Sequence, residues 1–189
     1  LDYLMKIISG KFKGKKLISS TNNKIRPTSS RAKELIFSTL HSILKKKELY
    51  IENLNILDCF CGSGALGLES ISRGCRKVYF LDKSIESINI TKKNCKAINV
   101  EKFAVFLNLD FRDINLPPIE VDLFFLDPPY NHFVISNVLE TLRNLKLIKK
   151  GSIGIVELPK KKNIESFEGY NIIKEKKVSN SLFYFIQKD

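Results

Sequence analysis

The segment Leu126-Asp127-Pro128-Pro129-Tyr130 has the residue types most suited to chemistry, because it directly follows an apolar run at 121–126. That run predicts a buried strand, and the residues after it predict a stiff polar turn. Proline has no backbone N–H, so the turn offers the Asp127 carboxylate and bare carbonyls such as that of Pro128. Acceptors beside the Tyr130 ring suit a planar substrate with an amino group, which indicates methylation of a nucleobase amine. Alone, such a segment is more often an ordinary proline-ended turn than a site.

A glycine-rich turn upstream favours the chemical interpretation. It runs from Asp58 through Phe60, Gly62, Gly64 and Gly67, between an apolar strand pattern and a helical pattern. The first two glycines allow a tight turn beside a ligand, and the third allows the helix to pack closely on the strand. This strand–turn–helix context predicts a nucleoside-cofactor site that includes these five residues.

Two further aspartates follow predicted strands at the same sheet edge. Asp82 ends the strand pattern at 78–81, where a carboxylate can bind ribose hydroxyls or, alternatively, cap the next helix. Asp110 follows the pattern at 103–107, in place to accept from an adenine amine, although an ordinary loop aspartate fits equally well. Both positions are therefore predicted to contribute to the cofactor site.

NAD and S-adenosylmethionine both contain an adenosine that such a loop can hold. Asp58 stands just before the glycines, where its carboxylate can attract the ammonium of a methionine moiety. A chain of 189 residues leaves no room for the separate substrate domain common in dehydrogenases. The Asp127-Pro128 turn also has no role in hydride transfer. These points favour S-adenosylmethionine as the cofactor.

The four cysteines do not have the spacing of a metal site. Cys59, Cys61, Cys75 and Cys95 are accompanied by only two histidines in the whole chain. Zinc would need further ligands at finger-like spacing. We predict reduced, small core or loop cysteines and no metal.

Positive charge gathers at the start of the chain. The net charge is +12, and residues 1–50 hold 12 basic and 3 acidic residues, a net of +9. Such asymmetry is typical of proteins that bind nucleic acid. Biased codon use would explain abundant lysine but not its clustering. The chain is therefore divided into a basic arm at 1–50 and a methyltransferase domain at 51–189.

The arm has structure of its own. Residues 6–17 combine β-formers, two glycines and alternating lysines, which predicts a short hairpin that presents Lys11 and Lys13. Residues 26–31 predict a turn into a helix with a hydroxyl N-cap and an apolar face that packs on the main domain. Arg26 and Arg31 in that segment join the two lysines as candidate nucleic-acid contacts. The alternative is that these arginines pair with acidic groups of their own domain.

Strand and helix patterns alternate from residue 54 onward. This alternation predicts an α/β, Rossmann-like fold with a mainly parallel sheet and helices on both faces. The strand patterns lie near 54–59, 77–81, 103–107, 121–126 and 152–157, and the helical patterns near 65–73, 84–98 and 133–147. Two last strand patterns, at 170–174 and 182–187, predict an antiparallel edge. No apolar run approaches the roughly 20 residues of a membrane span and no secretory signal is visible, so we expect a cytoplasmic protein without a membrane partner.

Taken together, the motifs resemble the bacterial guanine-N2 methyltransferases of 16S ribosomal RNA, the RsmD-type family. The resemblance covers nearly the whole chain from Lys6 and is carried by Ile7-Ile8-Ser9-Gly10, Gly14, Arg26-Pro27-Thr28, Arg31, Leu57-Asp58, Gly67-Leu68-Glu69, Asn94 and Asp127-Pro128-Pro129-Tyr130. The glycine loop and the proline turn occur in many methyltransferases, so the arm is the more family-specific part. The sequence departs from the family pattern after Asp82, where Ser84 stands in place of the usual Asp, and at Cys61, where Ala is common.

The resemblance implies a seven-stranded class I methyltransferase fold that uses S-adenosylmethionine. It implies a monomer that methylates a guanine N2 amine of 16S ribosomal RNA, within a small-subunit particle. In this interpretation Asp127 and the Pro128 carbonyl accept the two amine N–H groups while Tyr130 stacks on the base. The alternatives are a DNA adenine-N6 methyltransferase, which shares the Asp-Pro-Pro-Tyr turn, and a non-catalytic RNA-binding assembly factor.

Overall fold

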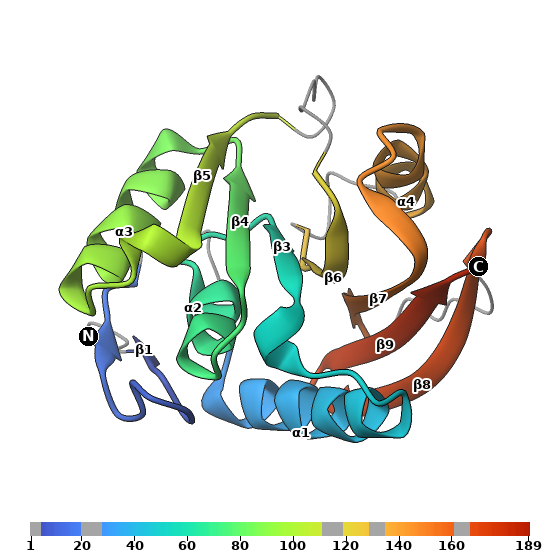
Figure 1. The fold of residues 1–189 in the computed structure, drawn as a ribbon, viewed down its shortest axis with the longest axis horizontal. Helices are drawn as coiled ribbons and strands as arrows, with labels where there is room; N and C mark the ends of the chain where they lie inside the picture. Colours follow the sequence, from blue (N-terminus) through green and yellow to red (C-terminus); the bar gives the residue numbers. More distant parts are fainter. Residues whose placement is uncertain (1–4, 20–27, 111–118, 129–134, 161–166) are drawn as a thin grey trace.

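The computed structural model describes residues 5–19, 28–110, 119–128, 135–160 and 167–189. Within these residues a seven-stranded sheet with the order β5-β4-β3-β6-β7-β9-β8 forms the centre of the molecule (Figure 1). Its strands are β3 (Asn55–Cys59), β4 (Lys77–Asp82), β5 (Ala104–Asn108), β6 (Val121–Leu126), β7 (Ile148–Pro159), β8 (Tyr170–Val178) and β9 (Ser181–Lys188). The helices are α1 (Ser30–Lys46), α2 (Ala65–Ser72), α3 (Ile85–Ala97) and α4 (Ile135–Asn144), with short 3-10 turns at Ile51–Asn53 and Glu101–Phe103.

The strand directions confirm the predicted sheet. The pairs β3–β4, β3–β6, β4–β5 and β6–β7 are parallel, whereas β9 runs antiparallel to both of its neighbours, β7 and β8. Within the C-terminal hairpin, β8 takes the outer position and β9 lies inside. β7 begins at Ile148, before the apolar pattern at 152–157. Its first residues include the exposed Lys149 and Lys150, so the start of the strand has no apolar pattern.

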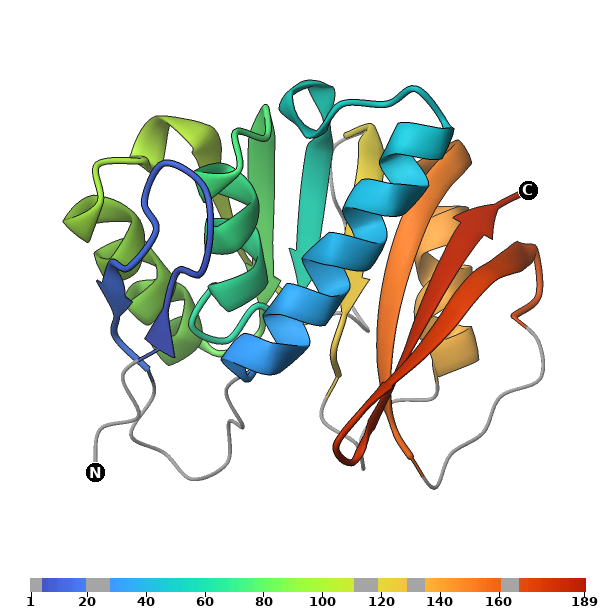
Figure 2. The ribbon, with the colours of Figure 1, turned by 90° about the horizontal axis from the view of Figure 1, so that it is seen from below.

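Helices cover both faces of the sheet, as the alternation predicted (Figure 2). Alternate residues of β3 and β6 point to opposite faces, so Ile56 and Phe125 join one apolar cluster and Leu57 and Phe124 join the other. The first cluster contains residues of α1, α2 and α3, and the second contains those of α4. None of the described helices is long and apolar enough to cross a membrane.

The helix of the N-terminal arm forms where its periodicity predicted. The Ser29 hydroxyl caps α1 by accepting from the Ala32 N–H at 3.1 Å. Ile36, Phe37 and Leu40 are buried against the sheet, as expected for the apolar face. The basic residues Lys45 and Lys46 lie in the last turn, where cations suit the helix dipole.

The predicted hairpin also forms, and it is packed into the same core. β1 (Met5–Lys6) pairs antiparallel with β2 (Lys16–Leu17). Met5, Ile7 and Leu17 are buried in the apolar cluster that contains α1 and α2. The hairpin is therefore packed against the central sheet and its helices rather than extended away from them.

Candidate functional site

The carboxyl ends of β3, β4, β5 and β6 meet at one edge of the sheet (Figure 1). The register places Cys59 beside both Leu81 and Leu126, and Asp82 beside Asn108. Four predicted site residues therefore lie at this edge: Asp58, Asp82, Asp110 and Asp127. Ligands bind at this edge in open α/β sheets.

The glycine turn has a backbone that few residues other than glycine adopt. Gly62 and Gly64 have φ values of 55° and 78°. A Cβ atom at Gly64 would come within 2.7 Å of Thr91 Cγ2, so close packing as well as conformation requires glycine there. Thr91 holds the turn from the other side, because its hydroxyl donates to the Gly62 carbonyl at 3.0 Å. Phe60 also has a positive φ of 59°, a strained conformation for a bulky residue at the entry to the turn.

Gly67 has the packing role predicted for it. A Cβ atom there would lie 2.2 Å from Phe80 Cε1 and 2.8 Å from Val78 Cγ1, both on β4. Its backbone N–H donates to Asp58 Oδ2 at 2.9 Å, which ties the first turn of α2 to the end of β3. Gly67 therefore shapes the site through packing and through this hydrogen bond.

Asp58 is a buried carboxylate whose electrostatics fit a cationic ligand. Its side chain is 3% exposed. Burial raises the pKa of Asp58 to about 7, the hydrogen bond from Gly67 opposes this shift, and nearby Asp82 adds to it. A cation beside Asp58 would offset the desolvation of the ionised form. The ammonium of S-adenosylmethionine supplies such a charge, so the residues present fit the predicted cofactor.

Asp82 ties the glycine turn to the next strand. Its Oδ2 atom accepts from the Gly62 N–H and its Oδ1 atom from the Ser84 N–H, both at 2.9 Å. The alternative that Asp82 caps α3 is wrong, because Ser84 is the N-cap and accepts from the Ser87 N–H at 3.3 Å. The departure from the family pattern at Ser84 thus provides the helix cap. Carboxylate oxygens accept more than one hydrogen bond, so Asp82 keeps acceptor capacity for a ribose hydroxyl.

Asp127 and Pro128 directly follow β6. Asp127 is half-buried and Pro128 is buried, directly after Leu126, which pairs with Cys59 of β3. Asp127 therefore lies next to the start of the glycine turn. Tyr130 lies outside the described residues. Asp110 is half-buried beyond β5, whose last residue, Asn108, donates to the carbonyls of Asp82 and Lys83 at 3.0 Å.

The candidate RNA contacts of the arm are at the surface. Lys11 and Lys13 are exposed in the loop of the hairpin, and Arg31 is exposed in the first turn of α1. Arg26 lies outside the described residues. The three described side chains are thus accessible to a macromolecular partner.

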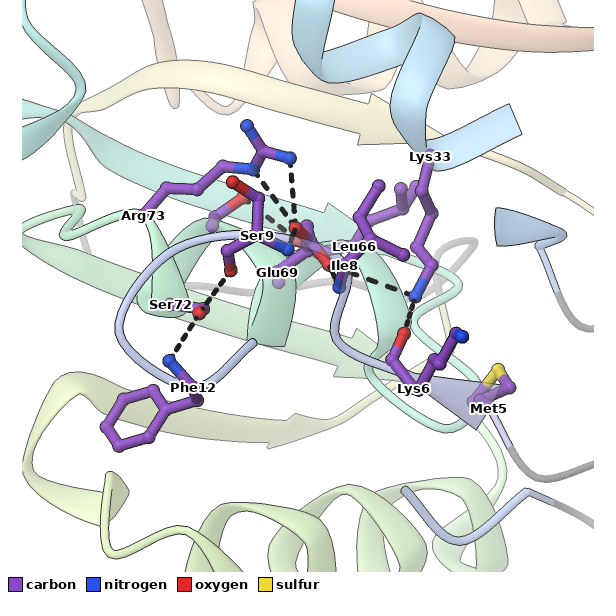
Figure 3. Close-up of polar contacts among 12 residues, drawn as sticks. Met5, Lys6, Ile8, Ser9, Phe12, Lys33, Leu66, Glu69, Ser72 and Arg73 are labelled. Atoms are coloured by element: carbon purple, nitrogen blue, oxygen red, sulfur yellow. Dashed lines mark hydrogen bonds and ion pairs between the residues drawn. The ribbon is translucent and has the colours of Figure 1, made fainter. Parts of the chain in front are cut away.

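Two buried polar residues hold the arm in place, one on α2 and one at the glycine turn, and their sequence context indicated no such role. Glu69 of α2 accepts from the backbone N–H groups of Ile8 and Ser9 at 2.9 and 3.0 Å (Figure 3). Arg73 binds the same carboxylate at 3.0 Å, and Lys33 of α1 approaches it at 3.9 Å. A glutamate in the otherwise apolar and small-residue stretch of α2 was the available signal. Asn94 of α3 is the second such residue and bonds to Ile18 and Ser63.

The cysteines are free and buried, as predicted. Burial raises the pKa values of the Cys75 and Cys95 thiols to about 12 and those of Cys59 and Cys61 well above the usual value. Thiols so shifted are poor nucleophiles. Among the described residues, no group of three or more histidine, cysteine or acidic side chains is arranged to hold a metal ion.

The chain is similar to known methyltransferases over almost its full length. It matches the family described as conserved hypothetical protein 95 over residues 5–187. It is 33% identical over 180 residues to a protein named ribosomal RNA small subunit methyltransferase D from Buchnera aphidicola, covering 93% of this chain and 88% of that protein. A protein of the same name from Haemophilus influenzae is 32% identical, with 91% and 88% covered.

Solved structures have the same fold. A putative methyltransferase from Escherichia coli matches with a TM-score of 0.84 at 21% identity, over 98% of each chain. A putative methylase from Haemophilus influenzae matches with a TM-score of 0.77 at 28% identity, also over 98% of each chain.

The fold and the site define a class I methyltransferase that depends on S-adenosylmethionine. Within that class the chain belongs to the family described as conserved hypothetical protein 95. The resemblance inferred from the sequence is thereby confirmed, since relatives named ribosomal RNA small subunit methyltransferase D cover most of the chain.

Proposed function

We propose that this protein methylates the exocyclic N2 amine of a guanine in 16S ribosomal RNA, as a cytoplasmic monomer acting on a small-subunit particle. The observation that carries the proposal is the position of Asp127 and Pro128. They follow β6 beside the end of β3, so acceptors for an amine lie next to the turn that suits the cofactor. The names of the curated relatives support ribosomal RNA as the substrate class.

In this proposal the residues of the turn make a poor nucleophile reactive. Bound S-adenosylmethionine supplies an electrophilic methyl group. The guanine amine delocalises its lone pair into the ring, so the protein must orient it. Asp127 accepts one N–H and the Pro128 carbonyl accepts the other, which favours a pyramidal nitrogen whose lone pair faces the methyl group. Positioning at about 3–3.5 Å is then the main catalytic contribution.

The proposed occupant of the site is a purine base. We propose that Tyr130 stacks on the guanine, which must be unpaired or flipped out to enter. After transfer the product nitrogen is cationic and acidic, so Asp127 or water takes its proton. A Thermus thermophilus 16S rRNA N2 methyltransferase with a related fold, at a TM-score of 0.66 and 15% identity, was solved with AdoMet and guanosine.

Asp58, Asp82 and the glycine turn hold the cofactor in this scheme. The Asp58 carboxylate binds the ammonium, and Asp82 accepts from ribose hydroxyls. Asp110 accepts from the adenine amine. The glycines at 62 and 64 bring backbone close to the ligand.

The direct test is methyl transfer from labelled S-adenosylmethionine to three substrates. These are unmodified 30S particles, naked 16S RNA and duplex DNA, each followed by nucleoside analysis. We expect N2-methylguanosine from the particles. Label in N6-methyladenine of DNA would show that the protein is instead a DNA adenine-N6 methyltransferase that uses the same site. No transfer to any substrate, with cofactor binding absent as well, would favour a non-catalytic assembly factor.

A further inference from the structure

Asn94 joins two parts of the molecule that are far apart in sequence. It lies on α3 and is 1% exposed. Its Oδ1 atom accepts from the Ile18 N–H at 2.7 Å, and its Nδ2 atom donates to the Ile18 carbonyl at 2.9 Å and to the Ser63 carbonyl at 3.0 Å. Both amide hydrogens and the amide oxygen are therefore engaged, and the side chain has little freedom to shift.

The two partners of Asn94 belong to segments with different proposed functions. Ser63 lies between Gly62 and Gly64 in the turn assigned to the cofactor. Ile18 directly follows β2, the strand that closes the hairpin with Lys11 and Lys13 in its loop. A single buried amide thus bonds to the cofactor turn on one side and to the hairpin on the other.

The hairpin is held at a second place, where its loop contacts α2. The Glu69 carboxylate accepts from two backbone N–H groups of the loop (Figure 3). The Ser72 carbonyl accepts from the Lys11 N–H at 2.7 Å. A Cβ atom at Gly10 would lie 1.9 Å from the Ser72 carbonyl oxygen, so the loop lies directly on the end of α2. The loop that carries Lys11 and Lys13 is also hydrogen-bonded within the hairpin, since the Ile7 N–H donates to the Lys15 carbonyl and the Gly14 N–H to the Ile7 carbonyl.

We propose that Asn94 is a positioning residue that couples the hairpin to the glycine turn, so that RNA and cofactor each strengthen the binding of the other. This rests on the proposed function, in which the hairpin contacts RNA. RNA bound to the loop lysines further restrains the hairpin, Asn94 passes this restraint to Ser63, and the cofactor then meets a more rigid turn. Linkage requires the reverse effect to be equally large.

Aspartate at this position has the same shape but lacks the required donors. A carboxylate accepts from Ile18 N–H as the amide does, but it cannot donate to the two carbonyls. The carbonyls of Ile18 and Ser63 would both lose a partner and face a negative charge. Asn94→Asp is therefore the sharpest change, and Asn89→Asp is its matched control, since Asn89 is exposed on the same helix.

The test measures the affinity for S-adenosylhomocysteine by calorimetry with and without unmodified 30S particles, the proposed substrate. The affinity for the particles is measured with and without saturating S-adenosylhomocysteine. In the wild-type protein and in Asn89→Asp we expect each ligand to tighten the other by at least about fivefold, a typical coupling. In Asn94→Asp we expect this factor to fall to about one. A coupling factor in Asn94→Asp equal to that of the wild type would overturn the proposal.

A second pair of variants keeps the test decisive if Asn94→Asp does not fold, as judged by circular dichroism. Ile18→Pro removes the N–H that Asn94 accepts, and Ile18→Ala keeps it. We expect Ile18→Pro to lose the coupling and Ile18→Ala to retain it. Equal coupling in the two variants would contradict the role of Asn94.

The wild-type protein separates this inference from the proposed function. Methylation of RNA with a coupling factor of one would overturn the inference alone. Absence of both RNA binding and RNA methylation would overturn the proposed function and the inference with it.

Discussion

The Asp58 carboxylate should make cofactor binding depend on pH. Burial raises its pKa to about 7 in the free protein, and the ammonium of a ligand favours the ionised form. We expect the affinity for S-adenosylhomocysteine to weaken about tenfold as the pH falls from about 8 to about 6, because Asp58 must lose a proton before binding. Calorimetry in buffers of different ionisation enthalpy would detect the released proton. Asp58→Asn should bind weakly at all pH values, and a pH dependence that survives in this variant would contradict the assignment.

The same raised pKa affects stability in the opposite direction. A carboxyl with a folded pKa above its unfolded value stabilises the protein below the unfolded pKa, and this contribution is lost as the pH rises through about 7. The free protein thus gains stability from protonated Asp58, whereas the cofactor requires the ionised form. Binding at neutral pH therefore includes the cost of ionising this group.

Asp127 should be needed for transfer but not for cofactor binding. Asp127→Asn keeps the shape of the side chain and removes the charged acceptor, so we expect kcat to fall by roughly 10²–10³ with an unchanged affinity for S-adenosylhomocysteine. Asp122→Asn is the control, since Asp122 lies near the start of β6, the strand that Asp127 follows, and pairs with Lys149 at 2.8 Å. Turnover of Asp127→Asn at the wild-type rate would contradict the proposed catalytic role of the Asp127 carboxylate.

At the scale of elements, Glu69 should hold the hairpin loop on α2. Glu69→Gln removes the charge that balances the fully buried Lys33 and the partly exposed Arg73. Leaving Lys33 buried without its anion should lower the free energy of unfolding by about 3 kcal/mol. Burial lowers the pKa of Lys33, and the Glu69 charge opposes that shift. Without Glu69, the charged form of Lys33 would therefore be less stable in the folded protein.

Chemical denaturation and amide hydrogen exchange would check this expectation. The Ile8 and Ser9 N–H groups should exchange faster in Glu69→Gln, because both donate to the Glu69 carboxylate. Glu34→Gln on the exposed face of α1 is the matched control and should leave stability within about 0.5 kcal/mol. Unchanged protection at both amides in Glu69→Gln would mean that the loop is held by its other contacts.

At the scale of the whole molecule, the sequence was sufficient to predict the sheet and the edge where the site lies. Buried parallel strands appear as short apolar runs, and the polar residue after each run marks its carboxyl end, as with Asp82 and Asp127. The roles of Glu69 and Asn94 could not be predicted, because their partners lie 61 and 76 positions away in the chain. Local patterns show what a helix buries but not which distant backbone groups it holds. The position of β9 between β7 and β8 could not be predicted either, because local patterns do not show which strands pair.

The uneven charge of the chain should determine how salt affects RNA binding. Each lysine that neutralises a phosphate of single-stranded RNA contributes about 0.7 to the slope of log affinity against log salt. Changing the exposed hairpin residues Lys11 and Lys13 to glutamine should therefore lower that slope by about 1.4, which filter binding at several salt concentrations would measure. The control changes Lys174 and Lys177 of β8, at the opposite end of the molecule in Figure 1, and removes the same net charge. An equal loss of slope in both double variants would mean that total charge, rather than contact through the hairpin, attracts the RNA.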